Sequence, residues 1–249
     1  MMKKFRGAAA KLILGFLWAG LLLAVGGCGL WTKKEPEKTP QSQYNDAVRL
    51  LEKKKYTDAA EAFKRFKEDY PLSTYTPLAE LRTADALYYD KNYAEAIVLY
   101  EEFRKLHPVH AEIPYVTYQV GMCHFQQMLS VDRDQTVAEK ALEQFRYLKE
   151  NFPQTKYASE ANTKMQQCLF RLAEHEFYVG HFYYRMKHYR GALGRFEELL
   201  KKYPGTGMEP RVNPLIKDCR ERIDRENDQK KEKEKKEKGK KTPDLQWGS

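Results

Sequence analysis

The segment YAEAIVLYEEFRKLHP, residues 93–108, decides the fold of this chain. Within it, Ala96 and Tyr100 are four residues apart, so they share one face of a helix, and Pro108 ends that helix. The chain repeats this pattern four times, each time with an aromatic residue or a histidine directly before the proline. The copies are Ala59/Phe63/Tyr70-Pro71, Ala96/Tyr100/His107-Pro108, Ala141/Phe145/Phe152-Pro153 and Ala192/Phe196/Tyr203-Pro204. An internal repeat of this kind predicts stacked helical units rather than an unrelated helical bundle.

Each of these helices has a predicted partner upstream. A small residue lies twelve positions before the alanine in three copies, at Ala47, Ala84 and Gly180, and twenty positions before it in the third copy, at Gly121. Paired antiparallel helices with small residues at their contacts resemble tetratricopeptide repeats, which stack into a right-handed superhelix with a concave face. We therefore expect an all-α superhelix of about ten helices over residues 42–229, with four clear repeats and a fifth at the end.

Three segments depart from the regular repeat. The eight extra residues of the third copy fall around residues 129–136, which we expect to form a polar loop. Residues 157–188 lie where the spacing is stretched, and they form either one long helix or two helices of a degenerate repeat. The Lys/Glu-rich run that begins at residue 230 is a solvated helical extension or disordered, and we expect disorder over residues 230–249.

The net charge of +9 belongs to the two ends of the chain. Residues 1–27 carry four basic residues and no acid, and residues 230–241 carry eight lysines against three glutamates. Residues 28–229 hold 32 basic and 31 acidic residues, a net charge of +1. A basic groove for DNA or RNA is therefore disfavoured, and we expect no nucleic-acid partner.

The N-terminus has the pattern of an exported lipoprotein. Residues 1–27 begin with basic residues, continue with an apolar run too short to span a membrane, and end in small residues, as a secretory signal does. Cys28 follows directly, and the junction resembles a bacterial lipobox, in which the cysteine receives a diacylglyceryl group and an N-acyl chain. Gly29, where an aspartate would favour retention, implies the periplasmic face of the outer membrane, and residues 28–41 read as a flexible tether. The alternative is an ordinary signal peptide with an incidental cysteine.

A candidate binding surface follows from the repeat. In tetratricopeptide repeats the first helix of each pair lines the concave face, and the corresponding positions here are rich in aromatic residues. We call this predicted surface the aromatic wall; its members are Tyr44, Asp85, Tyr88, Tyr89, Tyr118 and Phe125. Such a surface suits an extended peptide with aromatic side chains, gripped without covalent chemistry. The alternative is that the rings pack between helices as core, and that Asp85 is only a solvated charge.

No motif supports catalysis. The histidines lack the spacing of a helical metal pair, and no phosphate-binding glycine loop or nucleophile motif occurs. The cysteines that remain after lipidation are Cys123, Cys168 and Cys219; they lack CxxC spacing and are expected to be buried small hydrophobic residues. We therefore expect no catalytic residue, no metal site and no cofactor other than the acyl chains on Cys28.

Three segments together resemble the BamD/ComL family, lipoproteins of the outer-membrane β-barrel assembly machinery. They are LHPVHAEIPYVTY (106–118), VDRDQ (131–135) and the stretch 172–206. The resemblance covers residues 28–223; the shortened insertion and the Lys/Glu tail depart from it. It implies a non-catalytic scaffold that binds the C-terminal targeting strands of unfolded outer-membrane proteins in its first repeats.

The resemblance also implies partners. The last repeats would dock the periplasmic domains of the central barrel insertase, through an arginine that corresponds to Arg195, with Arg185 as a second candidate, and other assembly lipoproteins would bind as well. The alternative is a different repeat lipoprotein, such as a pilus-secretin pilotin or a cell-wall division factor. A third hypothesis, with less support, is a hydrolase that uses a histidine or a cysteine.

Overall fold

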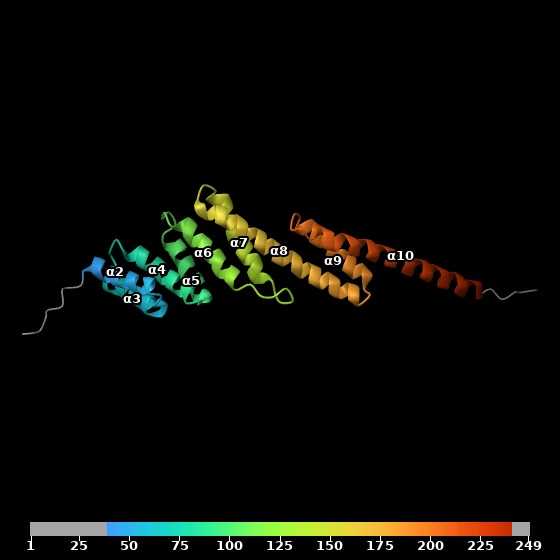
Figure 1. Ribbon diagram of the computed structural model, residues 1–249, viewed down its shortest axis with the longest axis horizontal. Helices are drawn as coiled ribbons and strands as arrows, with labels where there is room; N and C mark the ends of the chain where they lie inside the picture. The colour runs from blue at the N-terminus through green and yellow to red at the C-terminus, as the bar shows by residue number, and fades with distance from the viewer. Residues whose placement is uncertain (1–38, 241–249) are drawn as a thin grey trace, which may run out of the picture.

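The computed structural model describes residues 39–240, and within that range the chain is all α-helical with no strand (Figure 1). The predicted signal peptide and Cys28 lie outside the described residues. The helices are α2 (Pro40–Glu52), α3 (Tyr56–Asp69), α4 (Thr76–Tyr89), α5 (Tyr93–Leu106), α6 (Ile113–Gln126), α7 (Thr136–Asn151), α8 (Lys156–Arg185), α9 (Tyr189–Lys202) and α10 (Glu209–Lys240). The predicted all-α class is confirmed.

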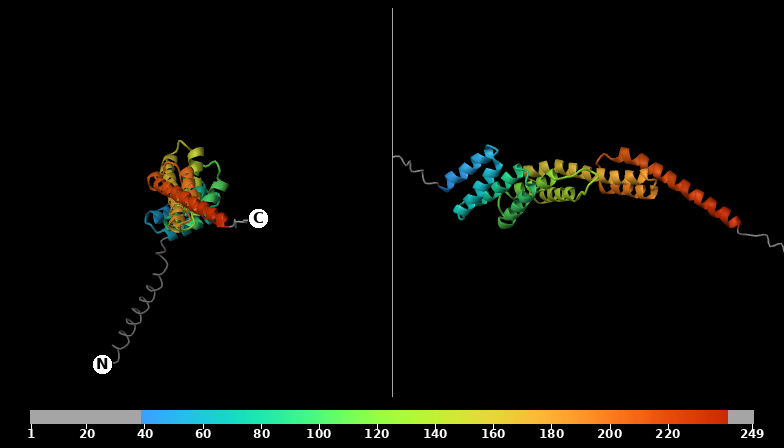
Figure 2. Two further views of the ribbon diagram at one scale, coloured as in Figure 1. Left: turned by 90° about the vertical axis from the view of Figure 1, so that its right-hand side faces the viewer. Right: turned by 90° about the horizontal axis from the view of Figure 1, so that it is seen from below.

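Consecutive helices pair as antiparallel hairpins that stack into an elongated body. α2 packs on α3, α4 on α3 and α5, and α6 on α5 and α7, so that three hairpins follow one another in the first half. α8 then packs on α7 with one part and on α9 with another, and α10 packs on α9. Figures 1 and 2 show α2 and the end of α10 at opposite ends of this body. This arrangement of hairpins is the predicted tetratricopeptide-repeat architecture.

The turns inside the hairpins have a common design. Lys54, Lys91 and Lys187 each adopt a left-handed conformation, with φ of 59°, 63° and 61°, directly after the first helix of a pair. The next amide N–H donates back to a carbonyl five residues earlier, for example from Lys55 to Leu50 at 3.0 Å. This Schellman-type closure satisfies carbonyls at the helix end and turns the chain sharply into the next helix. The third hairpin uses the longer loop 127–135 instead, as the sequence predicted.

Small residues and rings meet at the centre of each hairpin, as the repeat predicted. Phe63, Tyr100, Phe145 and Phe196 are fully buried, and so are Ala47 and Ala84 on the facing helices. A Cβ atom added to Gly121 would lie 2.6 Å from Phe145 Cε1, and one added to Gly180 would lie 2.7 Å from Phe196 Cε1. These two glycines are therefore required by the close approach of a ring, not by a turn.

The stretched segment is one helix. α8 runs unbroken for thirty residues, from Lys156 to Arg185, with Thr155 as its N-cap. The part of α8 up to Leu172 contributes Cys168 and Leu172 to a core shared with α6 and α7, while Ala173 begins a second core shared with α9 and α10. One helix therefore serves two successive hydrophobic cores.

The C-terminal helix extends further than predicted. Ile223 is the last apolar residue that packs against the core, yet α10 continues to Lys240 with the side chains of residues 230–239 exposed (Figure 2). The expectation of disorder is wrong for residues 230–240, because lysines and glutamates four residues apart support a solvated helix. Residues 241–249 lie outside the described range. At the other end α2 begins at Pro40, so the last two residues of the predicted tether are helical.

A buried carboxylate connects the second and third hairpins. Asp85 on α4 is only 1% exposed and accepts hydrogen bonds from the Tyr100 hydroxyl at 2.7 Å and the Tyr115 hydroxyl at 2.8 Å. Arg82 donates to its second oxygen at 2.5 Å. Burial and the adjacent Asp85 charge hold the pKa of Tyr100 well above its usual range, so both phenols stay protonated as donors. The carboxylate is thus fully paired and fixes three helices together.

The ring contact at Gly121 predicts the effect of one added methyl group. Gly121→Ala should lower the free energy of unfolding by about 1–3 kcal/mol, because the buried ring of Phe145 has to shift. Gly194→Ala is the matched control: this glycine is also in a helix, but a Cβ there meets nothing within 4 Å, so stability should be unchanged or rise by about 0.4–1 kcal/mol. Urea unfolding followed by circular dichroism measures both variants, and equal changes would contradict the packing argument.

Candidate functional site

Tyr44 and Tyr88, in the first part of the aromatic wall, are partly buried. Tyr44 stacks on Tyr75 with the ring centroids 5.1 Å apart, and also contacts Phe63 in the core. Tyr88 packs edge-on against Tyr93 at 5.5 Å, and burial raises the pKa of its hydroxyl. These two rings therefore fill space between hairpins as well as facing outward, which is the alternative considered from the sequence.

One tyrosine of a stacked pair remains open to solvent. Tyr89, at the end of α4, is 48% exposed and lies on Tyr56, at the start of α3, with centroids 5.5 Å apart and planes 25° from parallel. Tyr88 meets Tyr89 edge-on at 5.5 Å. Arg82, whose side chain is 37% exposed, is near enough to Tyr89 to lower the pKa of its phenol, although burial and Asp85 raise that pKa overall. The Arg82 guanidinium, itself paired with Asp85, thus lies within electrostatic range of the Tyr89 hydroxyl.

Tyr118 and Phe125 belong to a second location, between α6 and α8. Tyr118 contacts the ring of Tyr157 at 5.8 Å, and burial with the nearby Glu160 raises its pKa to about 12. Phe125 has the Lys164 ammonium 4.5 Å above its ring. Phe125 also borders an open hollow of ≈ 670 Å³, whose other side is formed by residues of α8 and by the turn between α9 and α10.

Tyr88 connects the two locations of the aromatic wall, because it packs against the core cluster of Tyr44 and also against that of Tyr118 and Phe125. Tyr44, Tyr88 and Tyr89 lie on the first two hairpins, and Tyr118 and Phe125 lie on α6. The prediction of Asp85 as an accessible groove residue is wrong, because its carboxylate is buried among hydroxyl and guanidinium donors.

The two arginines predicted for docking lie apart. Arg195 on α9 is about half exposed and its Nη1 is 3.1 Å from Glu176 Oε2 on α8. Arg185 is the exposed last residue of α8, nine residues beyond Glu176, which is about 13 Å along the helix. Arg195 is therefore paired with Glu176 of the same chain, and Arg185 lies at the far end of the same hairpin.

The C-terminal half contains a cluster that sequence reasoning did not assemble. The Arg211 guanidinium lies 4.3 Å from the centre of the Phe177 ring, and Arg222 lies 5.1 Å from that of Tyr189. Asp218 binds both the Tyr184 hydroxyl, at 2.5 Å, and Arg222, at 2.6 Å. Residues 211, 218 and 222 are spaced by seven and by four positions, which places them on one face of a helix. This spacing is the sequence signal from which the cluster could have been predicted.

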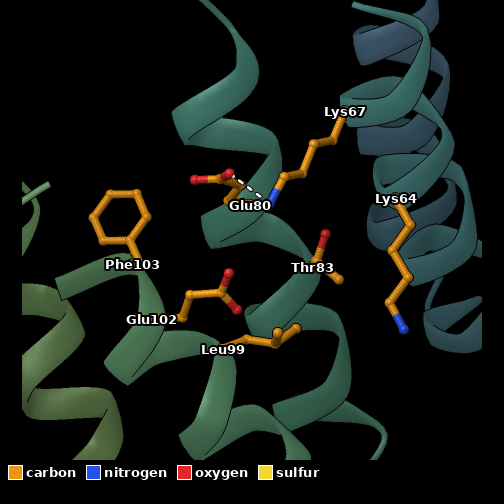
Figure 3. A pocket seen from close by; sticks show the side chains of 7 residues that line it. All are labelled: Lys64, Lys67, Glu80, Thr83, Leu99, Glu102 and Phe103. Carbon is orange, nitrogen blue, oxygen red and sulfur yellow. Dashed lines mark ion pairs between the residues drawn. The ribbon is translucent and has the colours of Figure 1, made fainter. Parts of the chain in front are cut away.

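A small charged cavity lies between α3, α4 and α5 (Figure 3). Glu80 Oε1 lies 2.7 Å from Lys67 Nζ, and Glu80 Oε2 lies 2.7 Å from His107 Nε2. Burial opposes the charge on Glu80, but these two partners together hold its pKa below the usual value. The volume is ≈ 70 Å³, small beside the ~300–1,000 Å³ of ligand pockets, so the cavity is a structural contact between hairpins.

Cysteine chemistry is disfavoured within the described range. Cys123, Cys168 and Cys219 are free and buried, and burial raises the pKa of the first two to about 12, which keeps the thiols protonated. Among residues 39–240 no cluster of His, Cys, Asp and Glu side chains is arranged to hold a metal ion. No helix in this part of the chain has the length and apolar character needed to cross a membrane.

Comparison with known proteins agrees with the resemblance seen in the sequence. Residues 36–236 match the sequence model of the YfiO family, described as an outer membrane lipoprotein. The outer membrane protein assembly factor BamD of Rickettsia prowazekii is 33% identical over 197 residues, which cover 79% of this chain and 78% of that protein. The BamD of Caulobacter vibrioides is 28% identical over 214 residues, covering 84% of this chain and 69% of that protein.

Solved structures with similar helical arrangements are more distant. Tetratricopeptide-like repeats of a kinesin light chain from Podospora anserina superpose with a TM-score of 0.43 at 12% identity, covering 77% of this chain and 99% of that one. A tetratricopeptide-repeat protein of Thermus thermophilus superposes with a TM-score of 0.40 at 15% identity, covering 72% of this chain and 99% of that one.

The family match extends over most of the chain, from the predicted tether into the C-terminal extension of α10. It replaces the pilotin, division-factor and hydrolase alternatives with one assignment. This chain belongs to the BamD family of outer-membrane proteins, which are non-enzymatic factors of outer-membrane protein assembly.

Proposed function

We propose that the first two hairpins bind the C-terminal targeting strand of unfolded outer-membrane β-barrel proteins. The observation that carries this proposal is that Tyr89 is exposed, is stacked on Tyr56 and lies within electrostatic range of the partly exposed Arg82. A strand that ends in an aromatic residue would offer a ring to Tyr89 and its terminal carboxylate to Arg82. Both groups are held in place before binding, Tyr89 by its neighbouring rings and Arg82 by Asp85.

The proposed recognition is non-covalent and of limited strength. Each ring contact contributes ~0.5–1.5 kcal/mol, so a few contacts give reversible capture. Reversibility suits a factor that passes an unfolded chain onward. Phe125, Lys164 and the hollow beside α8 supply a second apolar and positive location for residues of the same strand that precede its aromatic end.

The contribution of the exposed ring can be measured directly. Tyr89→Ala should weaken binding of a short synthetic peptide that ends in phenylalanine by roughly 2- to 10-fold, because one ring contact is lost. Tyr147→Ala is the matched control, since Tyr147 on α7 is also 45% exposed but lies outside the proposed site. Fluorescence titration gives both affinities, and an unchanged affinity for Tyr89→Ala would move the site elsewhere.

The last hairpins are proposed to dock the periplasmic domains of the central barrel insertase. Arg195 supports this because it is exposed and charged, and because Glu176 fixes its orientation across α8 and α9. Arg185 offers a second charge at the end of the same hairpin. Other assembly lipoproteins are expected as further partners, for which no residue is assigned.

Charge reversal tests the docking proposal. Arg195→Glu should strongly reduce recovery of the insertase's periplasmic domains in a pull-down, because an attractive charge becomes repulsive and the pair with Glu176 is lost. Arg65→Glu on α3 is the control: Arg65 is also exposed and paired with a glutamate on its own surface, but lies at the other end of the body. Equal recovery of the two variants would remove Arg195 from the interface.

Attachment to the outer membrane is proposed to occur through acyl chains on Cys28, which lies outside the described residues. The lipobox-like junction and the lipoprotein description of the matched family support it. Several acyl chains hold a protein durably on a bilayer, since each buried methylene contributes ~0.8 kcal/mol.

Removal of the acceptor thiol tests the anchor. Cys28→Ala should leave the helical domain folded but move the protein out of the membrane fraction. Fractionation of cells followed by circular dichroism of the purified variant measures both properties. Recovery of the variant in the outer membrane at the level of the unsubstituted chain would contradict the anchor.

A further inference from the structure

Two aliphatic side chains protrude from equivalent turns of the first two repeats. Leu72 and Val109 each follow the proline that ends the second helix of a hairpin, and each is 98% exposed. The corresponding positions after Pro153 and Pro204 hold a glutamine and a glycine. Full exposure of aliphatic residues at the same place in two neighbouring repeats, and only in those two among the four copies, suggests a shared contact.

These two turns lie on the edge of the body where the described chain begins. Gln43 Nε2, in the first turn of α2, donates to Asp69 Oδ2 at the end of α3, 2.7 Å away. His107, directly after α5, is tied to Glu80 near the start of α4. Figure 1 shows the turns after α3 and α5 along the upper edge of the body, on the same side as the start of α2. We call residues 70–75 and 107–112 the turn edge.

The proposed anchor brings this edge close to a bilayer. Eleven residues lie between Cys28 and Pro40, so these two residues can be at most ~43 Å apart. The loop between α6 and α7, by contrast, lies at the opposite edge of the same hairpins (Figure 1). A membrane attachment at Cys28 would therefore allow the turn edge to reach the lipid surface.

The chemistry of the turn edge favours lipid over protein. Leu72 and Val109 are separate protrusions, not the lining of a groove, and leucine and valine are under-represented among residues that dominate protein interfaces. Two nearby charged groups have partners: the Asp69 carboxylate accepts a hydrogen bond from Gln43, and Glu80 contacts His107. Leu72 and Val109 are themselves uncharged, so their tips can enter the headgroup region while charged neighbours stay on its aqueous side.

We propose that the turn edge rests on the periplasmic leaflet of the outer membrane, with Leu72 and Val109 inserted at the boundary between headgroups and acyl chains. This inference rests on the proposed anchor at Cys28. It fixes the orientation of the first two hairpins at the membrane, which a flexible tether alone leaves undetermined.

The test uses the full-length acylated chain with an environment-sensitive fluorophore at single introduced cysteines. Leu72→Cys and Val109→Cys probe the turn edge, and Leu129→Cys is the control, because Leu129 is 49% exposed in the loop at the opposite edge. The cysteines at 123, 168 and 219 are buried and are not expected to take the label. On vesicles of phosphatidylethanolamine and phosphatidylglycerol, labels at 72 and 109 should shift their emission to shorter wavelength and be quenched by brominated lipids, and the label at 129 should do neither.

Flotation of the same samples separates the two levels of the proposal. If the protein does not float with the vesicles, the anchor at Cys28 fails and this inference fails with it. If the protein floats but labels at 72 and 109 behave like the label at 129, the anchor stands and the membrane contact of the turn edge is overturned. A shift seen only after addition of the insertase's periplasmic domains would also overturn it, in favour of a protein partner.

Discussion

The contact between a small residue on the first helix of a hairpin and a buried ring on the second determines the geometry of the whole molecule. At Gly121 and Gly180 this contact is so close that even a methyl group would meet the ring. The facing rings are fully buried, so they set the distance between helices in each hairpin. Because every hairpin uses the same contact, the hairpins have similar cross-sections and can stack in one direction.

Stacking leaves only part of each first helix free for other roles. Tyr44, Tyr88 and Tyr118 lie where one hairpin meets the next, so they contribute to packing as well as to the outer face. Tyr89 is different because it lies at the end of α4, where the next hairpin no longer covers it. On the proposed function, the end of α4 is therefore available for binding, while the middle positions of the first helices stabilise the fold.

The repeat was predictable because its signal is local: four-residue spacing places an alanine and a ring on one face, and a proline ends the helix. The burial of Asp85 could not be predicted from the sequence, because its tyrosine partners are 15 and 30 residues away and come close only through tertiary packing. Position in the repeat correctly placed Asp85 on the first helix of a hairpin, but could not tell whether neighbouring hydroxyl groups covered it. The helical tail was misjudged for a related reason, because a composition typical of disorder also supports charge pairs four residues apart.

The unbroken course of α8 has a mechanical consequence. Thirty residues of helix measure about 45 Å, and the two ends of this segment lie in different hydrophobic cores. No loop separates those cores, so a displacement imposed on one half of the molecule reaches the other half through a stiff rod instead of being absorbed by a hinge. On the proposed function, a captured precursor and a docked insertase would be held at a set separation, and the geometry of transfer would be built into the scaffold before either arrives.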